Sequence, residues 1–217
     1  MEDTLRAIRF LNKHKVFLAL LFVVCLGASF IYVQQNKSVK KRSLANAKEV
    51  MAKIKQSAEV GDIIFRRGLN TESDIITYIS HSPFSHIGMV VSLEPFSIIH
   101  ASTDDDKMHL NQVIISSLED FLTQGNSVGL RRLDLPQELR AKIAEDSLAF
   151  LTKPFVLSTD STRFYCTTFL LDIISQRVDF EVDFINVDFA FLGGEYLFPS
   201  AFWNHKKTFE IISVSEF

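Results

Sequence analysis

The sequence contains only two cysteines, and their positions exclude a fold held together by disulfides. Cys25 lies inside an apolar segment and Cys166 lies far along the chain, so the two do not form a disulfide framework. The histidines and the one distant cysteine also make a poor zinc set, because no Cys-x-x-Cys or His-x-x-x-His pair occurs. We therefore expect no metal and no cofactor, and cysteine usage does not report the redox compartment.

The chain has little excess charge of either sign. Its net charge is −3, which gives no reason to expect nucleic acid as a partner. Gly193 and Gly194 predict a turn and not a phosphate-binding loop, because no Gly-Lys-Ser or Gly-Lys-Thr follows them. Hydrophobic residues make up 47% of the 217 positions, so we expect a packed core, in one ordinary domain plus an appendage.

Long apolar runs are also scarce, and the run from Val16 to Val33 stands out for that reason. It has 18 residues without a charge, about the minimum for a membrane-spanning helix. Gly27-Ala28-Ser29 is a poor version of a signal-peptide cleavage site. We therefore predict a tail over residues 1–15 and an uncleaved transmembrane anchor over residues 16–33. Basic residues flank the run on both sides, so its orientation stays open.

The segment after the anchor predicts a helical stalk over residues 34–60. Within it, Val50, Ile54 and Ala58 fall near one face of an amphipathic helix. From Gly61 the pattern changes to consecutive strands followed by helices, which favours an α+β domain over residues 61–217. The expected strands and helices are Gly61–Arg67, Ser73–His81, Ser85–Ser92, Phe96–Ser102, Gln112–Ser116, Ser117–Leu122, Ser127–Leu133, Pro136–Leu151 and a helix around Cys166.

Three residues could carry chemistry in this domain. Cys166 lies about where its helix should begin, and a helix N-terminus favours a thiolate. His86 and His100 lie on two strands joined by a short connection, and their numbers sum to 186, centred on position 93. If these strands form an antiparallel hairpin, the two histidines are neighbours across it.

Each of these residues also has a purely structural interpretation. Free cysteine is among the most buried residue types, so Cys166 can be inert core. Histidines at strand ends are structural or exposed more often than catalytic, and we assign His81, His109 and His205 to that group. The acidic run over residues 104–106 is most simply a solvated loop. Composition and spacing alone do not decide between catalysis and a structural role.

Four segments in order resemble one known family. They are similar to the motifs of the permuted papain-like cysteine hydrolases, the YiiX/YaeF-like group, and read GDIIFR, SHIGMVV, IIHAS and FYCTTFLLDII. These proteins are circularly permuted relatives of the NlpC-type cell-wall peptidases and are related to lecithin–retinol acyltransferase. LFPSAFWNH, over residues 197–205, also resembles a late segment of the family. The resemblance implies an antiparallel sheet packed on helices.

The resemblance also implies roles for individual residues. Cys166 would be the nucleophile, His86 the general base and His100 the polar group that orients it. Tyr165 and Thr167 would contact the substrate. Many members have Glu in place of His100, and the histidine here resembles the acyltransferase branch. Members often carry Ser-Glu directly after the cysteine, where this chain has Thr167 and Thr168.

The function predicted from these features is a membrane-anchored cysteine hydrolase that cleaves an amide bond of a peptide or cell-wall type. Its substrate would be a peptide or another amide. In a second interpretation the protein is a lipid acyl hydrolase or acyltransferase, and its substrate is an acyl lipid. A third interpretation is a catalytically silent binding module tethered to the membrane. We expect a bacterial inner-membrane location with the domain in the periplasm.

Overall fold

The computed structural model describes residues 45–189 and 192–217. Contacts divide the chain into two units, Met1–Ala45 and Asn46–Phe217, and only the second is described below. The predicted tail, the predicted membrane span and residues 34–44 of the predicted stalk lie outside the described residues. Within the described ranges, no helix combines the length and apolar character needed to cross a membrane.

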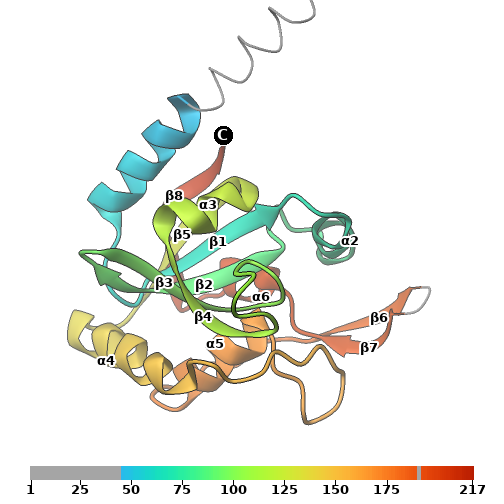
Figure 1. Ribbon diagram of the computed structural model, residues 1–217. Helices are drawn as coiled ribbons and strands as arrows, with labels where there is room; N and C mark the ends of the chain where they lie inside the picture. Colours follow the sequence, from blue (N-terminus) through green and yellow to red (C-terminus); the bar gives the residue numbers. More distant parts are fainter. Residues whose placement is uncertain (1–44, 190–191) are drawn as a thin grey trace, which may run out of the picture. The chain divides into compact units, whose positions relative to one another are not determined.

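A six-stranded antiparallel sheet forms the centre of the unit, in the order β4-β3-β2-β1-β5-β8 (Figure 1). Its strands are β1 (Ile63–Gly68), β2 (His86–Leu93), β3 (Phe96–Ser102), β4 (Gln112–Ser117), β5 (Gly125–Leu133) and β8 (Thr208–Glu216). A separate two-stranded ribbon consists of β6 (Ile185–Phe189) and β7 (Leu192–Tyr196). This antiparallel sheet with segregated helices confirms the predicted α+β class.

Helices connect and cover these strands. They are a helix over residues 45–57, α2 (Thr71–Ser80), α3 (Leu118–Thr123), α4 (Gln137–Ser147), the 3₁₀ turn η1 (Leu148–Phe150), α5 (Cys166–Ser175) and α6 (Pro199–Trp203). Pro136 precedes α4, where its fixed φ suits a helix start. Asn70 caps α2, because its side chain accepts a hydrogen bond from the Ser73 N–H.

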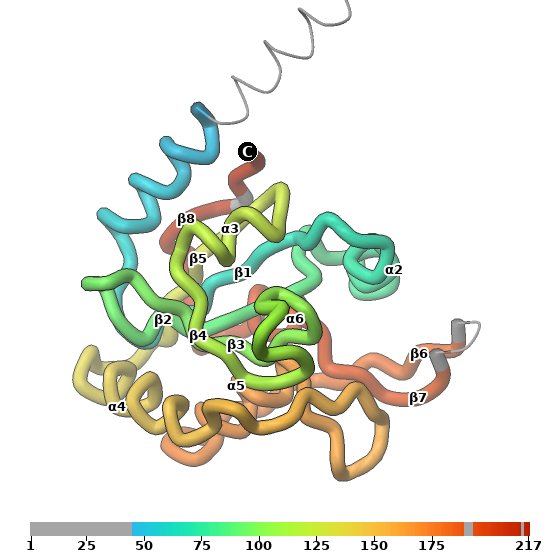
Figure 2. The backbone as a smooth tube through the Cα atoms, in the orientation of Figure 1, coloured from blue at the N-terminus to red at the C-terminus, as the bar shows by residue number. Residues whose placement is uncertain are grey.

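Side chains alternate between the two faces of the sheet along each strand, and both faces are covered by a hydrophobic core. On β1, Ile63 and Phe65 join a core shared with α4 and α5, while Ile64 joins a second core shared with α3. Figure 2 shows α4 and α5 on one side of the sheet and α3 on the other. The sheet therefore holds α5, whose first residue is Cys166, in a fixed position.

The helix over residues 45–57 belongs to this compact unit. Val50 and Ile54, together with Ala58 just beyond the helix, are buried in the second core, so the predicted amphipathic face is confirmed. A stalk was predicted up to residue 60, with the domain starting at Gly61. The packing instead places residues from Asn46 onward in the same compact unit as the sheet.

Candidate active site

The N-terminus of α5 positions Cys166. Tyr165 is the N-cap residue, with an extended backbone, and Cys166 is the first helical residue. The Tyr165 N–H donates to Thr168 Oγ1 at 2.8 Å, and the Thr168 hydroxyl donates to the Tyr165 carbonyl at 3.2 Å. Thr168 therefore satisfies the N-cap N–H from the third helical position, as the Glu of a capping box does. The departure from Ser-Glu preserves this local interaction.

Tyr165 and Thr167 both hold the backbone of Leu197. The Leu197 N–H donates to the Tyr165 hydroxyl at 2.8 Å, and the Thr167 hydroxyl donates to the Leu197 carbonyl at 2.8 Å. Thr167 is fully buried and does not line the cavity, whereas Tyr165 does. Of the two predicted substrate contacts, the structure therefore gives only Tyr165 access to the cavity. Thr167 connects α5 to the residues before α6.

His86 and His100 are brought together as the hairpin prediction required. The two rings lie 5.0 Å apart between centroids, and His86 Nε2 lies 2.9 Å from His100 Nδ1. His100 Nε2 lies 2.9 Å from the Ser116 hydroxyl on β4. If His86 keeps Nδ1 unprotonated to act as a base, its Nε2–H donates to His100, and His100 donates in turn to Ser116. One tautomer of each ring satisfies this whole chain.

The predicted strand register is off by two residues. Met89 pairs with Ile99 and Val90 with Ile98, so the pair numbers sum to 188 and not 186. The direct partner of His86 is Arg66 on β1. The two histidines therefore meet on a diagonal, which is still within reach of aromatic side chains. Gly88 permits this approach, because a Cβ there would lie 3.1 Å from His100 Cβ.

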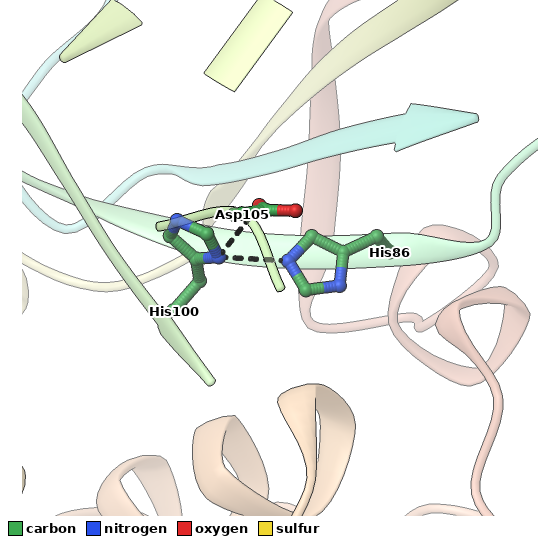
Figure 3. A group of neighbouring side chains, drawn as sticks. All are labelled: His86, His100 and Asp105. Atoms are coloured by element: carbon green, nitrogen blue, oxygen red, sulfur yellow. Dashed lines mark hydrogen bonds and ion pairs between the residues drawn. The ribbon is translucent and has the colours of Figure 1, made fainter. Parts of the chain in front are cut away.

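A buried ion pair, which no sequence pattern predicted, completes the polar end of the site. Arg66 donates to both carboxylate oxygens of Asp105, at 2.8 and 2.6 Å, and its guanidinium lies 4.6 Å from the centre of the Phe121 ring. Asp105 also lies 3.7 Å from His100 Nδ1 (Figure 3). The predicted solvated loop is thus wrong for Asp105, whose side chain is only 9% exposed. The buried arginine of β1 draws this carboxylate inward.

Burial keeps the reactive groups neutral. Burial raises the pKa of the Cys166 thiol to about 11, although the Ile87 and Thr167 N–H groups and the Arg66 charge oppose the rise. Burial and the Arg66 charge lower the pKa of His100 to about 3. The same two causes hold the pKa of His86 well below its usual value. The resting site is therefore a thiol beside neutral imidazoles, and not a thiolate–imidazolium pair.

Cys166 and His86 line the same cavity, which has a volume of about 660 Å³. In the described part of the chain, no hydrogen bond joins them. The second ring nitrogen of His86 points away from His100 (Figure 3) and is left for a partner on the cavity side. Catalytic hydrogen bonds are often long in a free enzyme and tighten when the substrate binds. The arrangement can thus support acyl transfer to sulfur.

One group of described residues also has ligand atoms close enough for a metal. Atoms of His86, His100 and Asp105 lie within 4.8 Å of one another. These atoms are already used, however, because the two rings bond each other and both Asp105 oxygens accept from Arg66. A cation would have to displace the Arg66 guanidinium, so the set as arranged does not fit a divalent metal.

Three further histidines among the described residues lie outside the site. His109 is exposed and pairs with Asp106, while His205 stacks on Phe180. His81 ends α2 in the left-handed conformation, with φ 48°. Each position agrees with the structural interpretation predicted for these three residues.

An antiparallel sheet packed on a helix that begins with cysteine defines the papain-like class in permuted order, with His86 lining the same cavity as the cysteine and His100 buried behind His86. The chain belongs to the family of permuted papain-like amidase enzymes, YaeF/YiiX, whose model matches residues 57–200. Its fold is similar to the crystal structure of the metalloprotein YiiX from Escherichia coli O157:H7. That match has a TM-score of 0.60 and 19% identity, and it covers 72% of this chain and 98% of the other. No curated protein matches the chain.

Proposed function

We propose that this protein hydrolyses an amide bond through a thioester on Cys166, with His86 as the acid–base group. One observation carries the proposal. Cys166 occupies the first position of α5 and lines the same cavity as His86. The Nε2 atom of His86 is held by His100, which leaves Nδ1 for the proton transfer. Family membership supports the amidase class, and the geometry supports the assignment of roles.

Because the resting pair is neutral, the proton moves as the sulfur attacks. His86 Nδ1 takes the thiol proton while Sγ forms a bond to the carbonyl carbon, and the carbonyl electron pair moves to oxygen. The tetrahedral adduct then collapses. The carbon–nitrogen bond breaks, the leaving amine takes the proton from His86, and a thioester remains. His86 then deprotonates a water molecule, which attacks the thioester carbonyl. The carbon–sulfur bond breaks, the acid is released, and His86 returns the proton to sulfur.

The backbone N–H of Cys166 supports the oxyanion in this scheme. The first N–H groups of a helix have no intrahelical partner, and the α5 dipole favours negative charge there. The lowered pKa of His86 favours protonation of the leaving amine. Its imidazolium is a strong acid beside Arg66, so it readily protonates the leaving group.

Membrane attachment and substrate location remain part of the proposal. The uncharged run from Val16 to Val33 supports an anchor, and a periplasmic domain would face cell-wall peptides. Alkaline carbonate extraction tests the anchor, because an anchored chain stays with the membrane pellet. Release into the supernatant would contradict it.

The two cysteines provide a matched test of the mechanism. Cys166→Ala should abolish acyl-adduct formation from p-nitrophenyl acetate, followed by mass spectrometry of the intact chain, whereas Cys25→Ala should not change it. Amide turnover, followed with acyl aminomethylcoumarins, should show the same dependence. An adduct that maps to a residue other than Cys166 would overturn the assignment.

Metal binding is the competing function, because the E. coli YiiX of similar fold is described as a metalloprotein. The Arg66–Asp105 pair argues against it in this chain. We expect Zn²⁺ to inhibit by binding His86, and EDTA to leave activity unchanged. Loss of activity in EDTA that Zn²⁺ restores would favour the metal-dependent alternative.

A further inference from the structure

Helix α2 places its polar and apolar residues in an unusual order. Its buried side chains are Ser73, Thr77 and Ser80, which are small and polar. The Thr77 hydroxyl donates a hydrogen bond to the Asp74 carbonyl, and the Ser80 hydroxyl donates one to the Ile76 carbonyl. A surface helix ordinarily buries its apolar stripe in the core. Here the apolar stripe is directed elsewhere.

The apolar stripe of α2 faces the cavity. Ile75, Ile76 and Ile79 all line it, and none of them packs against either hydrophobic core of the described unit. All three are half-buried. Tyr78, on the same helix, does not line the cavity and is 72% exposed. The isoleucines therefore contribute apolar surface to the cavity alone.

Other elements extend the same apolar wall. Leu69 precedes α2, Leu157 lies in the segment before α5, and both line the cavity although they are 65% and 61% exposed. Tyr196 and Phe198 contribute aromatic rings from the end of β7 and the residues after it. Exposing these apolar groups to water costs free energy in proportion to their exposed area, and a ligand that covers them would remove that cost.

The charges in the cavity exclude an anionic ligand of the usual kind. Among the described lining residues, the only cationic side chain is Arg66, and Asp105 already neutralises it. Glu72 and Asp104 add negative charge to the lining. A substrate rich in carboxylates or phosphates would find no free cation to pair with here.

We propose that the cavity binds the acyl side of the substrate as an aliphatic chain, held against the isoleucines of α2 with its carbonyl at Cys166. This inference rests on the proposed cysteine hydrolase function and names its substrate class, amides or esters of apolar carboxylic acids. The volume of about 660 Å³ lies within the range of small-molecule sites, which are mostly apolar with a few placed polar groups. Cys166 and His86, which line the same cavity, supply the polar groups that orient the carbonyl.

A chain-length series tests the proposal on the full chain. The probes are p-nitrophenyl esters and aminomethylcoumarin amides of acetic, butyric, octanoic and decanoic acid, compared by kcat/KM. We expect an increase of about fourfold per methylene until the cavity is full, which is the ordinary value of burying one methylene. Equal kcat/KM for butyryl and decanoyl probes, with turnover still dependent on Cys166, would overturn the acyl-chain inference and leave the hydrolase function intact.

Two variants on one helix connect the effect to α2. Ile79→Asp should lower the ratio of decanoyl to acetyl kcat/KM by at least about tenfold, because one carboxylate replaces buried apolar contact. Tyr78→Asp carries the same change on the exposed face and should leave that ratio as in the wild type. A ratio that does not respond to Ile79→Asp would contradict the assignment.

A binding measurement separates this inference from the proposed function. Cys166→Ala should bind N-methyldecanamide by calorimetry and show no heat with N-methylacetamide. If turnover fails for every probe but this selectivity holds, the hydrolase function is wrong and the acyl-chain site stands. If the two amides bind equally or not at all, the acyl-chain site is wrong.

Discussion

Helices α2 and α5 have equal length and both line the cavity, yet they place their apolar residues in opposite ways. Phe169, Leu170, Ile173 and Ile174 of α5 are fully buried in the core. The isoleucines of α2 lie outside both cores and face the cavity. Each helix has ten residues, so length does not explain the contrast.

The contrast separates two requirements of an enzyme site. A nucleophile must be held within a fraction of an ångström, and a helix buried along its length provides that rigidity. A substrate surface must stay accessible, so its apolar residues cannot be used for the core. We therefore expect substitutions on α5 to lower stability and substitutions on α2 to change substrate preference.

The largest effect should come from the acid–base group. His86→Ala should lower kcat/KM by about 10²–10⁴-fold, because proton transfer to and from the substrate is lost. The free energy of unfolding should fall by about 1–3 kcal/mol, because the buried His100 ring loses its hydrogen-bond partner. His109→Ala is the control, because that ring is exposed and pairs only with Asp106. Comparable losses in the two variants would remove His86 from the mechanism.

The contrast between the helices has a direct test in stability. Ile173→Ala on α5 should lower the free energy of unfolding by about 2–5 kcal/mol, through lost burial and a new cavity. Ile76→Ala on α2 should lower it by less than about 1 kcal/mol, because that side chain packs against neither core. Urea denaturation with an unchanged m-value measures both. Equal losses would mean that α2 is an ordinary core helix.

Sequence reasoning predicted this fold where periodicity is strong. The two runs of β-forming residues around His86 and His100, and the helix that starts at Cys166, follow from local patterns. The edge strand β8 was missed, because the aromatic tail has weak periodicity and its pairing with β5 is long-range. Arg66 and Asp105 were missed for a similar reason. Asp105 lies in an acidic run, and only its contact with a residue 39 positions away buries it.

The inverted polarity of α2 was visible in the sequence but was not interpreted. TESDIITYIS has isoleucines at helical spacing, which predict a buried face. Nothing local distinguishes an apolar face covered by a core from one covered by a ligand. The distinction needed the position of Ser73 and Thr77 against the sheet.

Acid should destabilise the site through its neutral histidines. Below pH 6.5 the unfolded chain takes up a proton on His100, whereas the folded chain does so only near pH 3. The unfolded state thus binds more protons, and stability falls by up to about 1.4 kcal/mol for each pH unit below 6.5. The full contribution is present above pH 6.5. His100→Gln should show a shallower slope between pH 6.5 and 4.5 in urea titrations, and an identical slope would contradict the neutral assignment.

The smallest effect concerns the cap that fixes Cys166. Thr168→Ala removes the acceptor of the Tyr165 N–H and should lower the free energy of unfolding by about 1 kcal/mol. Thr168→Glu supplies the third-position Glu of a standard capping box, and its carboxylate can accept from the same N–H. It should therefore recover both stability and the rate of Cys166 alkylation by iodoacetamide, measured in a Cys25→Ser background. If Glu fails where Thr succeeds, the 4% exposed pocket around position 168 admits only the smaller side chain. In that case the start of α5 would be held by the packing around Thr168, and not by the cap hydrogen bond alone.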